Sequence, residues 1–348
     1  MRYLSEYAYE LPPELVAQQP LPHRTDARLM VLDRQDDSIG HYYVRDLPEL
    51  LRDGDLLVLN NSQVIPARLV GYRSRTRGRW EGLFLREDAQ GVWCVLAKTR
   101  GKIASGEDVM LVNREGRDHT PLRLVESMGE GQWLVRPKAT MTARELLGEI
   151  GRVPLPHYIR DGEMLPADVA AYQTVYATHP GSVAAPTAGL HFTHELLGLL
   201  EHQGIRTTQV TLHVGVGTFR PITCERIDDH CMHSEWGSIS ESAARHLART
   251  RESQGRIVAV GTTTTRILES ARAEVGFQAW NGATDLFIRP PYEFQAVDGL
   301  LTNFHLPRST LLVLVRTFGG DALIQRAYAE AIQEQYRFYS YGDAMLIL

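Results

Sequence analysis

The residues with the clearest capacity for chemistry follow short apolar segments of the chain. Histidines occur in three such places, within AGLHFT, TLHVG and TNFHLP, as His191, His213 and His305. Glu235 ends the polar segment DHCMHSE, and Asp343 follows the glycine of SYGD. Histidine and carboxylate side chains exchange protons near neutral pH, each typically contributing ~10²–10⁴-fold to a rate. We therefore predict acid–base chemistry at these five residues.

A second set of residues near the same segments is suited to hold a ligand. Glycines let a ligand approach the backbone closely, and free amides at the start of a helix favour a carboxylate or phosphate. In GTTTTRILES we expect a strand to lead through a loop of four threonines into a helix. The candidate ligand-binding residues are Thr187, Gly189, Gly215, Gly217, Thr218, Gly261, Thr262, Thr263, Arg266 and Asn303. Ordinary turns and a capped helix would explain the same residues, so that alternative stays open.

One further cluster has side chains that bind metals. DHCMHSEW contains His230, Cys231, His233 and Glu235, and zinc accepts all three of these side-chain types. The spacing differs from HExxH, so we favour hydrogen bonding around a substrate or within the core and predict no metal ligand. The alternative function supported by this cluster is a metal-dependent hydrolase on an α/β barrel. A GxxxxGKS/T segment is absent, and Arg220 stands where a dinucleotide fingerprint needs its third glycine.

A basic stretch lies between Ser62 and Trp80, which contains five arginines and no acidic residue. The five are Arg68, Arg73, Arg75, Arg77 and Arg79. Guanidinium groups in such a run can contact the phosphates of a nucleic acid without reading its sequence. A charged, solvated hairpin explains the stretch about as well, so by itself it identifies no partner.

Two kinds of elements must position these residues. Between about Arg73 and Arg152, short β-like segments recur between turn clusters, which is typical of an antiparallel sheet or small barrel. Elsewhere strands alternate with helices, which indicates βα units, a mainly parallel sheet and ligand binding at its carboxyl edge. We therefore predict an α/β catalytic domain at 1–72 and 153–348, with an inserted β domain at 73–152.

Hydrophobic patterning and turn residues place the individual elements. The expected helices lie at 46–51, 142–150, 193–203, 241–253, 266–275 and, for the most part, 309–336. The expected strands outside the insertion lie at 28–32, 55–59, 181–186, 206–215, 256–261, 283–288 and 338–348.

Composition limits the class of protein. With 348 residues the chain has room for about two domains at ~150 residues each, and 43% hydrophobic residues can bury a substantial core. Its apolar runs are far shorter than the roughly 20 residues of a membrane span, and the N-terminus lacks a signal-peptide pattern. Three cysteines without a CxxC pair indicate a reduced, cytoplasmic protein. The net charge of −5 does not exclude a nucleic-acid partner, because local patches decide that.

Eight segments, taken in order, closely resemble one family, the S-adenosylmethionine:tRNA ribosyltransferase-isomerases of queuosine biosynthesis. They are DLLVLNNSQVIPARL, YQTVYA, GSVAAPTAGLHFT, LHVGVGTFRP, HCMHSEW, GTTTTRILES, LLTNFHLPRSTLLVLV and YRFYSYGDAMLIL. They run from about Asp55 to the C-terminus, and the β-rich region between them is the most divergent. Ser62 and Gln63 stand where the family commonly has Thr and Arg.

The resemblance implies a reaction and a fold. The ribosyl group of S-adenosylmethionine would be transferred to 7-aminomethyl-7-deazaguanine at the wobble position of a tRNA and isomerised, giving epoxyqueuosine-tRNA, adenine and methionine. A barrel-like α/β main domain would carry an inserted antiparallel β-barrel. No cofactor is expected, because the sulfonium already activates the substrate. The expected partners are tRNA and S-adenosylmethionine, with no membrane, and we expect a monomer.

The same resemblance implies roles for the candidate residues. Proton removal beside the sulfonium, protonation of the departing adenine and neutralisation of the aminomethyl group would fall to the three histidines and two carboxylates, without an individual assignment. The threonine loop with Gly261 would hold the methionine carboxylate, assisted by Arg266. Gly215 and Gly217 would let the adenosine lie against the backbone.

Overall fold

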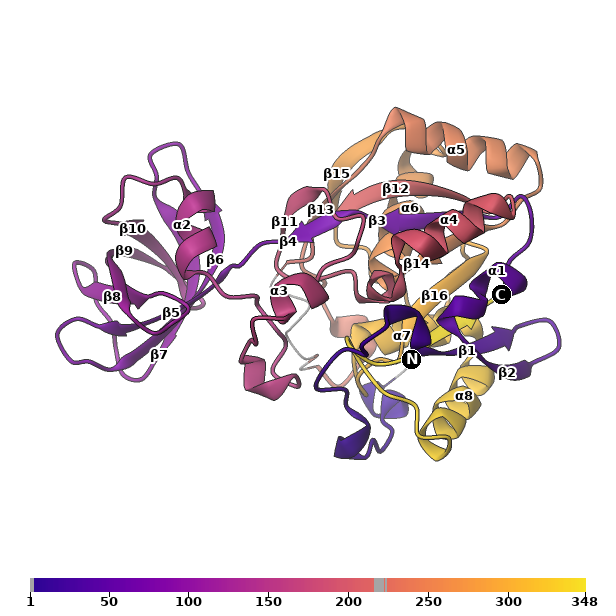
Figure 1. Ribbon diagram of the computed structural model, residues 1–348, viewed down its shortest axis with the longest axis horizontal. Coiled ribbons are helices and arrows are strands. Elements are labelled where there is room, and N and C mark those ends of the chain that lie inside the picture. The colour runs from indigo at the N-terminus through magenta and orange to yellow at the C-terminus, as the bar shows by residue number, and fades with distance from the viewer. Residues whose placement is uncertain (1–2, 216–221, 223) are drawn as a thin grey trace. The chain divides into compact units, whose positions relative to one another are not determined.

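The chain forms two compact units in the computed structural model, which describes residues 3–215, 222 and 224–348 (Figure 1). The larger unit comprises 1–64, 156–161 and 170–348, and the smaller comprises 65–155 and 162–169. The smaller unit is therefore an insertion in the chain of the larger one. The domain boundary predicted between residues 72 and 73 would cut the first strand of this unit, β5 (Arg68–Arg73). In the structure all of β5 belongs to the smaller unit.

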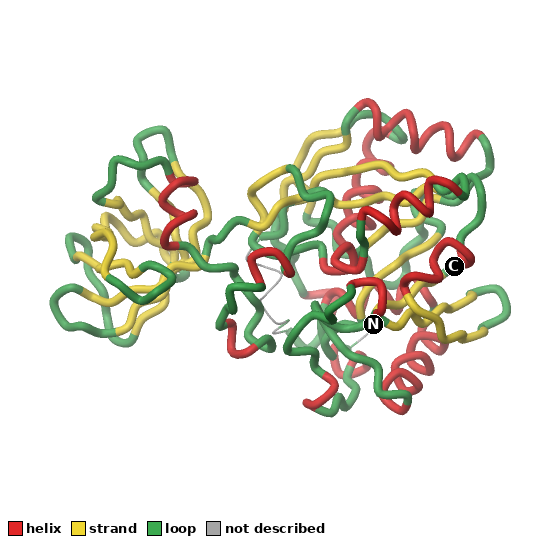
Figure 2. The backbone as a smooth tube through the Cα atoms, in the orientation of Figure 1, coloured by secondary structure: helices red, strands yellow, loops and turns green. Residues whose placement is uncertain are grey.

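The smaller unit is a closed antiparallel barrel with the strand order β10-β7-β6-β5-β8-β9. After β5 these strands are β6 (Arg79–Glu87), β7 (Trp93–Thr99), β8 (Asp108–Val112), β9 (Asp118–Gly129) and β10 (Gln132–Pro137), followed by α2 (Ala143–Ile150). Buried and more exposed residues alternate along β6 and β8, as expected for strands with one face toward a core. Figure 2 shows this unit as mostly strands and loops. The predicted inserted antiparallel β-barrel is confirmed.

The larger unit contains a nine-stranded mixed sheet with the order β15-β13-β12-β3-β14-β16-β17-β1-β2. Its strands are β1 (Arg28–Asp33), β2 (Ser38–Tyr43), β3 (Leu56–Asn60), β12 (Arg206–Leu212), β13 (Glu235–Ile239), β14 (Ile257–Val260), β15 (Trp280–Thr284), β16 (Gly299–Asn303) and β17 (Ala344–Ile347). A parallel pair, β4 (Ser62–Val64) and β11 (His179–Ser182), forms a separate two-stranded sheet. The α/β class is confirmed.

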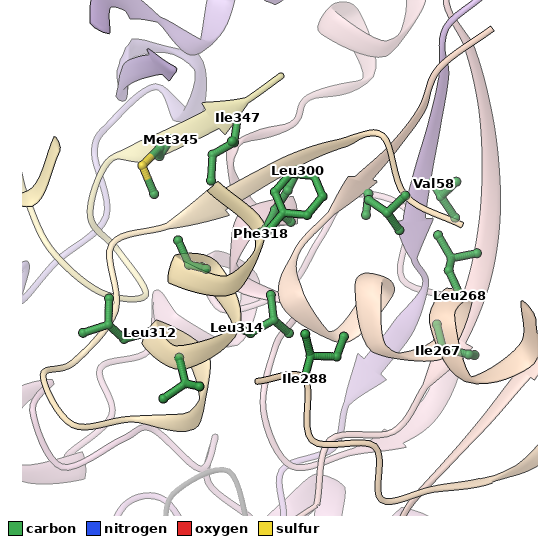
Figure 3. Packing of buried hydrophobic residues seen from close by; sticks show 14 of the residues in the cluster. Val58, Ile267, Leu268, Ile288, Leu300, Leu312, Leu314, Phe318, Met345 and Ile347 are labelled. Atoms are coloured by element: carbon green, nitrogen blue, oxygen red, sulfur yellow. The ribbon is translucent and has the colours of Figure 1, made fainter. Parts of the chain in front are cut away.

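Helices cover both faces of the large sheet. Alternate apolar side chains of β3 point to opposite faces and are buried in two separate clusters. Leu56 and Val58 pack with α5 (Glu241–Glu252), α6 (Thr262–Val275), α7 (Thr310–Gly319) and α8 (Asp321–Gln333). Leu57 and Leu59 pack with α1 (Leu47–Leu50) and α4 (His194–His202). Figure 3 shows apolar residues of α6 and α7 packed on the face of the sheet to which Val58 points. Burial on both faces explains why β3 is apolar until its last residue.

Several predicted elements differ from the structure. The strand expected at 181–186 lies earlier, as β11, and the terminal strand expected at 338–348 is confined to β17. The helix expected to begin at Arg266 begins at Thr262, so the four threonines form its first turn and not a loop. The strand expected at 283–288 lies earlier, as β15. The helical stretch 309–336 is divided by Gly320, whose φ of +84° does not continue a helix.

The remaining short helix, α3, spans Asp168–Ala171. Within the described residues, no helix has the length and apolar character that crossing a bilayer requires.

Candidate active site

The carboxyl ends of four parallel strands meet at one edge of the large sheet. β12, β3, β14 and β16 are neighbours in that order. Asn60, the last residue of β3, donates from Nδ2 to the Leu212 carbonyl at the end of β12 (3.0 Å) and to Thr263 Oγ1 in α6 (3.3 Å). Polar residues that follow separate strands therefore touch one another at this edge, where α/β sheets bind ligands.

Thr187, His191 and Asn303, which we call the Asn303 cluster, form a hydrogen-bond network at the same edge. Thr187 Oγ1 donates to Asn303 Oδ1 (2.7 Å), and Asn303 Nδ2 lies 3.2 Å from His191 Nε2. The same amide nitrogen donates to the backbone carbonyl of Asp343 (3.4 Å). Since Oδ1 accepts and Nδ2 donates, the network fixes the Asn303 amide in one orientation and makes His191 Nε2 an acceptor.

The His191 imidazole is neutral near pH 7. Burial lowers its pKa to about 4, and the positive charges of Arg24 and Arg337 act in the same direction. A neutral imidazole accepts a hydrogen bond at one nitrogen, which matches its contact with Asn303. His191 is therefore suited to hold a polar group in place, and less suited to donate a proton.

A glycine brings this part of the chain close to a buried tyrosine. Gly189 lies in the short 3₁₀ helix Thr187–His191, and a Cβ there would come within 2.0 Å of Tyr176 Oη. A side chain at this position would displace the tyrosine or the helix that carries Thr187 and His191. The predicted ligand-binding role of Gly189 thus has a packing explanation in the structure.

The threonines at the start of α6 divide into two pairs. Thr264 Oγ1 donates to the Val260 carbonyl (2.7 Å) and Thr265 Oγ1 to the Gly261 carbonyl (3.3 Å), so both hydroxyls serve their own helix. Thr262 and Thr263 precede them at the helix N-terminus, after Gly261 with φ +94°. The amides of this first turn remain a place where a carboxylate would be stabilised.

Glu235 and Arg266 form an ion pair whose side chains are 4% and 6% exposed. The Arg266 guanidinium also donates to the backbone carbonyls of Leu286 (3.0 Å) and Thr284 (3.4 Å). Glu235 Oε1 accepts from the backbone amide of Gly215 (2.9 Å). Arg266 is thus occupied by protein groups, which argues against its predicted contact with a methionine carboxylate.

His213 differs from the other candidate histidines because it is only partly buried. Its ring stacks on Trp236, with 5.6 Å between centroids and 16° between planes. Its Nδ1 is buried without a hydrogen-bond partner in the described part of the chain. Burial, followed by the charge of His179, lowers its pKa. A neutral imidazole with an unused ring nitrogen is suited to accept a proton.

His305 and Asp343 are held by protein groups. His305 Nε2 lies 2.8 Å from Thr302 Oγ1, and burial lowers the pKa of this imidazole to about 3. The Asp343 carboxylate accepts the backbone amides of Arg28 at Oδ1 (2.9 Å) and of Arg337 at Oδ2 (2.7 Å). Both side chains connect elements near the strand ends, and these contacts compete with the predicted acid–base roles.

The cluster considered for a metal is not assembled as one. Glu235 faces Arg266, while His230 packs edge-on against Phe287 and Cys231 is exposed. Over the described ranges, no three His, Cys, Asp or Glu side chains gather in a group that could hold a metal ion. The metal-hydrolase alternative therefore gains no support. Gly217 and Thr218, predicted to contact the ligand, lie outside the described residues.

The five arginines of the basic stretch are not equivalent. Arg68 pairs with Glu81 (3.2 Å) and Glu163 (3.1 Å), and Arg73 pairs with Glu107 through two contacts of 2.5 and 3.0 Å. The exposed Arg79 also pairs with Glu81 (2.7 Å) and Glu163 (3.5 Å).

Arg75 and Arg77 are exposed and have no ion pair among the described residues. Arg77 lies over the ring of Tyr72, 3.7 Å from its centroid. These two arginines are the members of the predicted set that are free to meet a phosphate, whereas Arg79 is exposed but ion-paired.

Sequence reasoning did not include two residues that the structure places near the strand ends. Asn60 joins β12, β3 and α6, and its signal was available, because NN follows the buried strand LLVL. Trp236 stacks on His213 from the neighbouring strand, and the alternating burial of β13 would have placed it on the more exposed face.

The larger unit has polar residues at the carboxyl ends of its parallel strands, and the inserted unit is a closed β-barrel. Together they define an α/β protein with an inserted barrel unit and a candidate ligand site at the sheet edge. The chain belongs to the family described as queuosine biosynthesis protein, whose model matches residues 4–347.

Relatives in this family are similar over almost their whole length. The S-adenosylmethionine:tRNA ribosyltransferase-isomerase of Thermotoga maritima is 46% identical over 345 residues, and that of Caldanaerobacter subterraneus subsp. tengcongensis is 44% identical over 345 residues. Each alignment covers 99% of both chains. A crystal structure of S-adenosylmethionine tRNA ribosyltransferase from Thermotoga maritima is similar with a TM-score of 0.56 and 37% identity, over 99% of this chain and 100% of that one.

Proposed function

We propose that this chain is an enzyme that transfers and isomerises the ribosyl group of S-adenosylmethionine onto 7-aminomethyl-7-deazaguanine in the wobble position of a tRNA. The products are epoxyqueuosine-tRNA, adenine and methionine. The observation that carries the proposal is the joined set of polar residues at the carboxyl edge of the sheet, within a chain that matches its family from residue 4 to 347.

The site supplies one group suited to a proton transfer of this reaction. A base must remove a proton from the ribose carbon next to the sulfonium, and a second acceptor must keep the attacking aminomethyl group neutral. Of the five candidates, we assign proton acceptance to His213, because its Nδ1 lacks a described partner and its pKa lies below the ordinary value. His191, Glu235, His305 and Asp343 are bound to protein groups and act by positioning.

The ligand-binding role falls to two groups of residues at this edge. The Asn303 cluster offers an amide and a hydroxyl held in fixed orientation. The start of α6, with Gly261, Thr262 and Thr263, offers backbone amides suited to the methionine carboxylate. Gly215 lies at the carboxylate of Glu235, where its lack of a side chain would let adenosine approach the backbone.

We propose that the tRNA backbone contacts the barrel unit at Arg75, Arg77 and Arg79, whose exposed guanidinium groups are suited to phosphates. The reaction needs no metal or cofactor, because the sulfonium makes adjacent bonds reactive without one. We further propose that the protein acts in the cytoplasm as a monomer. Unchanged turnover after dialysis against a chelator would agree with the cofactor proposal, and loss restored by stoichiometric zinc would contradict it.

The decisive experiment measures adenine release by chromatography. Adenine should appear only when the purified protein is given both S-adenosylmethionine and a tRNA carrying the precursor base. A tRNA with unmodified guanine at the same position is the matched control and should give none. Mass spectrometry of the reacted tRNA should show the added ribosyl-derived mass. A methyl group on the base, without that mass, would make the chain a methyltransferase and overturn the proposal.

A further inference from the structure

Trp236 is half-exposed and lies beside the candidate base His213. The Trp236 side chain belongs to β13, in which its neighbours Glu235 and Gly237 are buried whereas Trp236 is 45% exposed. The other four tryptophans, at positions 80, 93, 133 and 280, are between 0% and 8% exposed. A large aromatic side chain that stays half-exposed, while every other tryptophan is buried, is a candidate contact surface.

The indole does not lie loosely on the surface, because a layered stack supports it. The His213 ring packs against Trp236 at 5.6 Å and 16°. A Cβ on Gly181 would come 3.1 Å from two atoms of the His213 ring and 3.3 Å from a third, so Gly181 lies against that ring. Its φ of +144° is a conformation that residues with side chains rarely adopt. Segments from β11, β12 and β13 thus hold the two rings parallel.

The chemistry of the stack fits a nucleobase. Aromatic side chains stack on any base, because every base has a π-face, so such a contact contributes to binding whatever the RNA sequence. The side chain of His179 near His213 is a histidine and not a carboxylate, so it would not repel a nearby phosphate. The Glu235 carboxylate on the adjacent residue is neutralised by Arg266.

We propose that Trp236, supported by His213, is a stacking platform for an unpaired base of the anticodon loop of the RNA substrate; this inference rests on the proposed function. The half-open position of the indole favours RNA over the adenine of S-adenosylmethionine. A small ligand is normally enclosed over most of its surface, whereas a base in a long polymer is held by contacts elsewhere too. The platform would place the RNA loop next to the residue assigned as proton acceptor.

Acrylamide quenching of tryptophan fluorescence tests this directly, since Trp236 is the exposed tryptophan among five. An anticodon stem-loop RNA carrying the precursor base should protect the accessible fraction of the fluorescence. S-adenosylmethionine alone should not. The Trp236→Ala variant should lack the accessible fraction from the start. Protection by S-adenosylmethionine alone would assign the indole to the small substrate. Protection that rises with protein concentration in the absence of RNA would assign it to a second copy of the chain. Either result would overturn the proposal.

Kinetics supply the second readout. Trp236→Ala should raise KM for the RNA about tenfold and leave KM for S-adenosylmethionine nearly unchanged, while Trp236→Phe should restore most of the loss. Tyr42→Ala removes another exposed aromatic, 41% exposed on β2, and should alter neither. If the wild-type protein releases adenine but Trp236→Ala keeps the wild-type KM for RNA, only the platform is refuted. If the wild type releases no adenine with both substrates present, the proposed function itself fails.

Discussion

Glu235, the first residue of β13, and Arg266, in the second turn of α6, form an almost fully buried ion pair. The other oxygen of this carboxylate, Oε1, accepts the amide of Gly215, just beyond β12, at 2.9 Å. One carboxylate therefore joins two strands and a helix at the edge where the candidate site lies. Because both charges are removed from water, each depends on the other for compensation.

Glu235→Gln should reduce the free energy of unfolding by about 3–5 kcal/mol, because it leaves the Arg266 charge buried without a counter-charge. The glutamine is nearly the same size and can still accept the Gly215 amide, so the loss reports the charge and not the volume. Urea titration followed by circular dichroism measures it. Glu241→Gln is the control, since Glu241 pairs with Arg245 on the exposed face of α5, where the side chains are 84% and 62% exposed. That variant should change stability by less than about 0.5 kcal/mol, and an equal loss in the two variants would refute a special role for the buried pair.

Asp343→Ala should lower stability by about 2 kcal/mol, because the partly buried backbone amides of Arg28 and Arg337 would lose their acceptor. Asp343→Asn keeps one acceptor oxygen and should lose roughly half as much. The measurement pairs urea unfolding with turnover per folded molecule. An Asp343→Ala protein of wild-type stability that no longer turns over would show that the carboxylate takes part in proton transfer, as the sequence suggested.

These contacts show what could be predicted from the sequence and what could not. The change from alternating short strands to βα units locates the barrel and the sheet, because local periodicity encodes both. The same patterning places His213 and Asn303 at strand ends, whereas His191, also expected there, lies in the 3₁₀ helix Thr187–His191. The patterning does not reveal partners, since Asp343 binds the amide of Arg28, 315 positions earlier, and Arg73 binds Glu107, which directly precedes β8. Intrinsic propensity does not favour a helix for the threonines preceding Arg266, because they are β-branched. In the structure, burial of Thr264 and Thr265 overrides that propensity.

Stability should fall as the pH drops below about 6.5, with a contribution from two histidines. Burial lowers the pKa of His191 to about 4 and that of His305 to about 3, whereas unfolded histidine titrates near 6.5. Between these values the unfolded chain binds more protons, so each histidine removes up to about 1.4 kcal/mol of stability per pH unit. Above pH 6.5 both histidines are neutral in the folded and in the unfolded chain, so they no longer make the stability depend on pH.

Urea unfolding at pH 7.5 and 5.0 checks this dependence. His305→Gln should show a smaller loss of stability between the two pH values than the wild type, whatever its stability at pH 7.5. His194→Gln, at an exposed position that begins α4, should match the wild-type difference. A pH dependence that is the same in all three proteins would show that His305 is not kept neutral by burial.

His213→Gln should reduce kcat by about 10²–10⁴-fold, which is the usual contribution of a positioned base, while the protein remains folded. The activity of the wild-type protein at acidic pH is a second readout. Because the pKa of His213 is lowered, its imidazole stays neutral, and activity should persist to a lower pH than an ordinary histidine would allow. Single-turnover adenine release across pH 5 to 8 measures both quantities. His179→Gln, a nearby exposed histidine on β11, is the matched control and should retain activity within about tenfold. Wild-type turnover in His213→Gln with both substrates bound would remove this residue from the reaction.

Replacement of Arg75 and Arg77 by glutamine should weaken tRNA binding and flatten its salt dependence. Neither arginine is ion-paired within the described chain, so each can release counterions when it meets a phosphate. The slope of log Kd against log salt should fall by about 1.4–1.8, which corresponds to two lost phosphate contacts. Arg73→Gln should instead destabilise the barrel, because it breaks the pair with Glu107.

The matched control for the double variant removes the same charge from the other unit. Arg245 and Arg249 are exposed on α5, and their replacement by glutamine changes the net charge equally. Because a general electrostatic attraction would respond to both double variants alike, only a local contact makes them differ. Filter binding between 50 and 200 mM salt should therefore show a reduced slope for the barrel variant and the wild-type slope for the α5 variant. Equal slopes in all three proteins would mean that Arg75 and Arg77 are simply solvated and that the RNA is bound elsewhere.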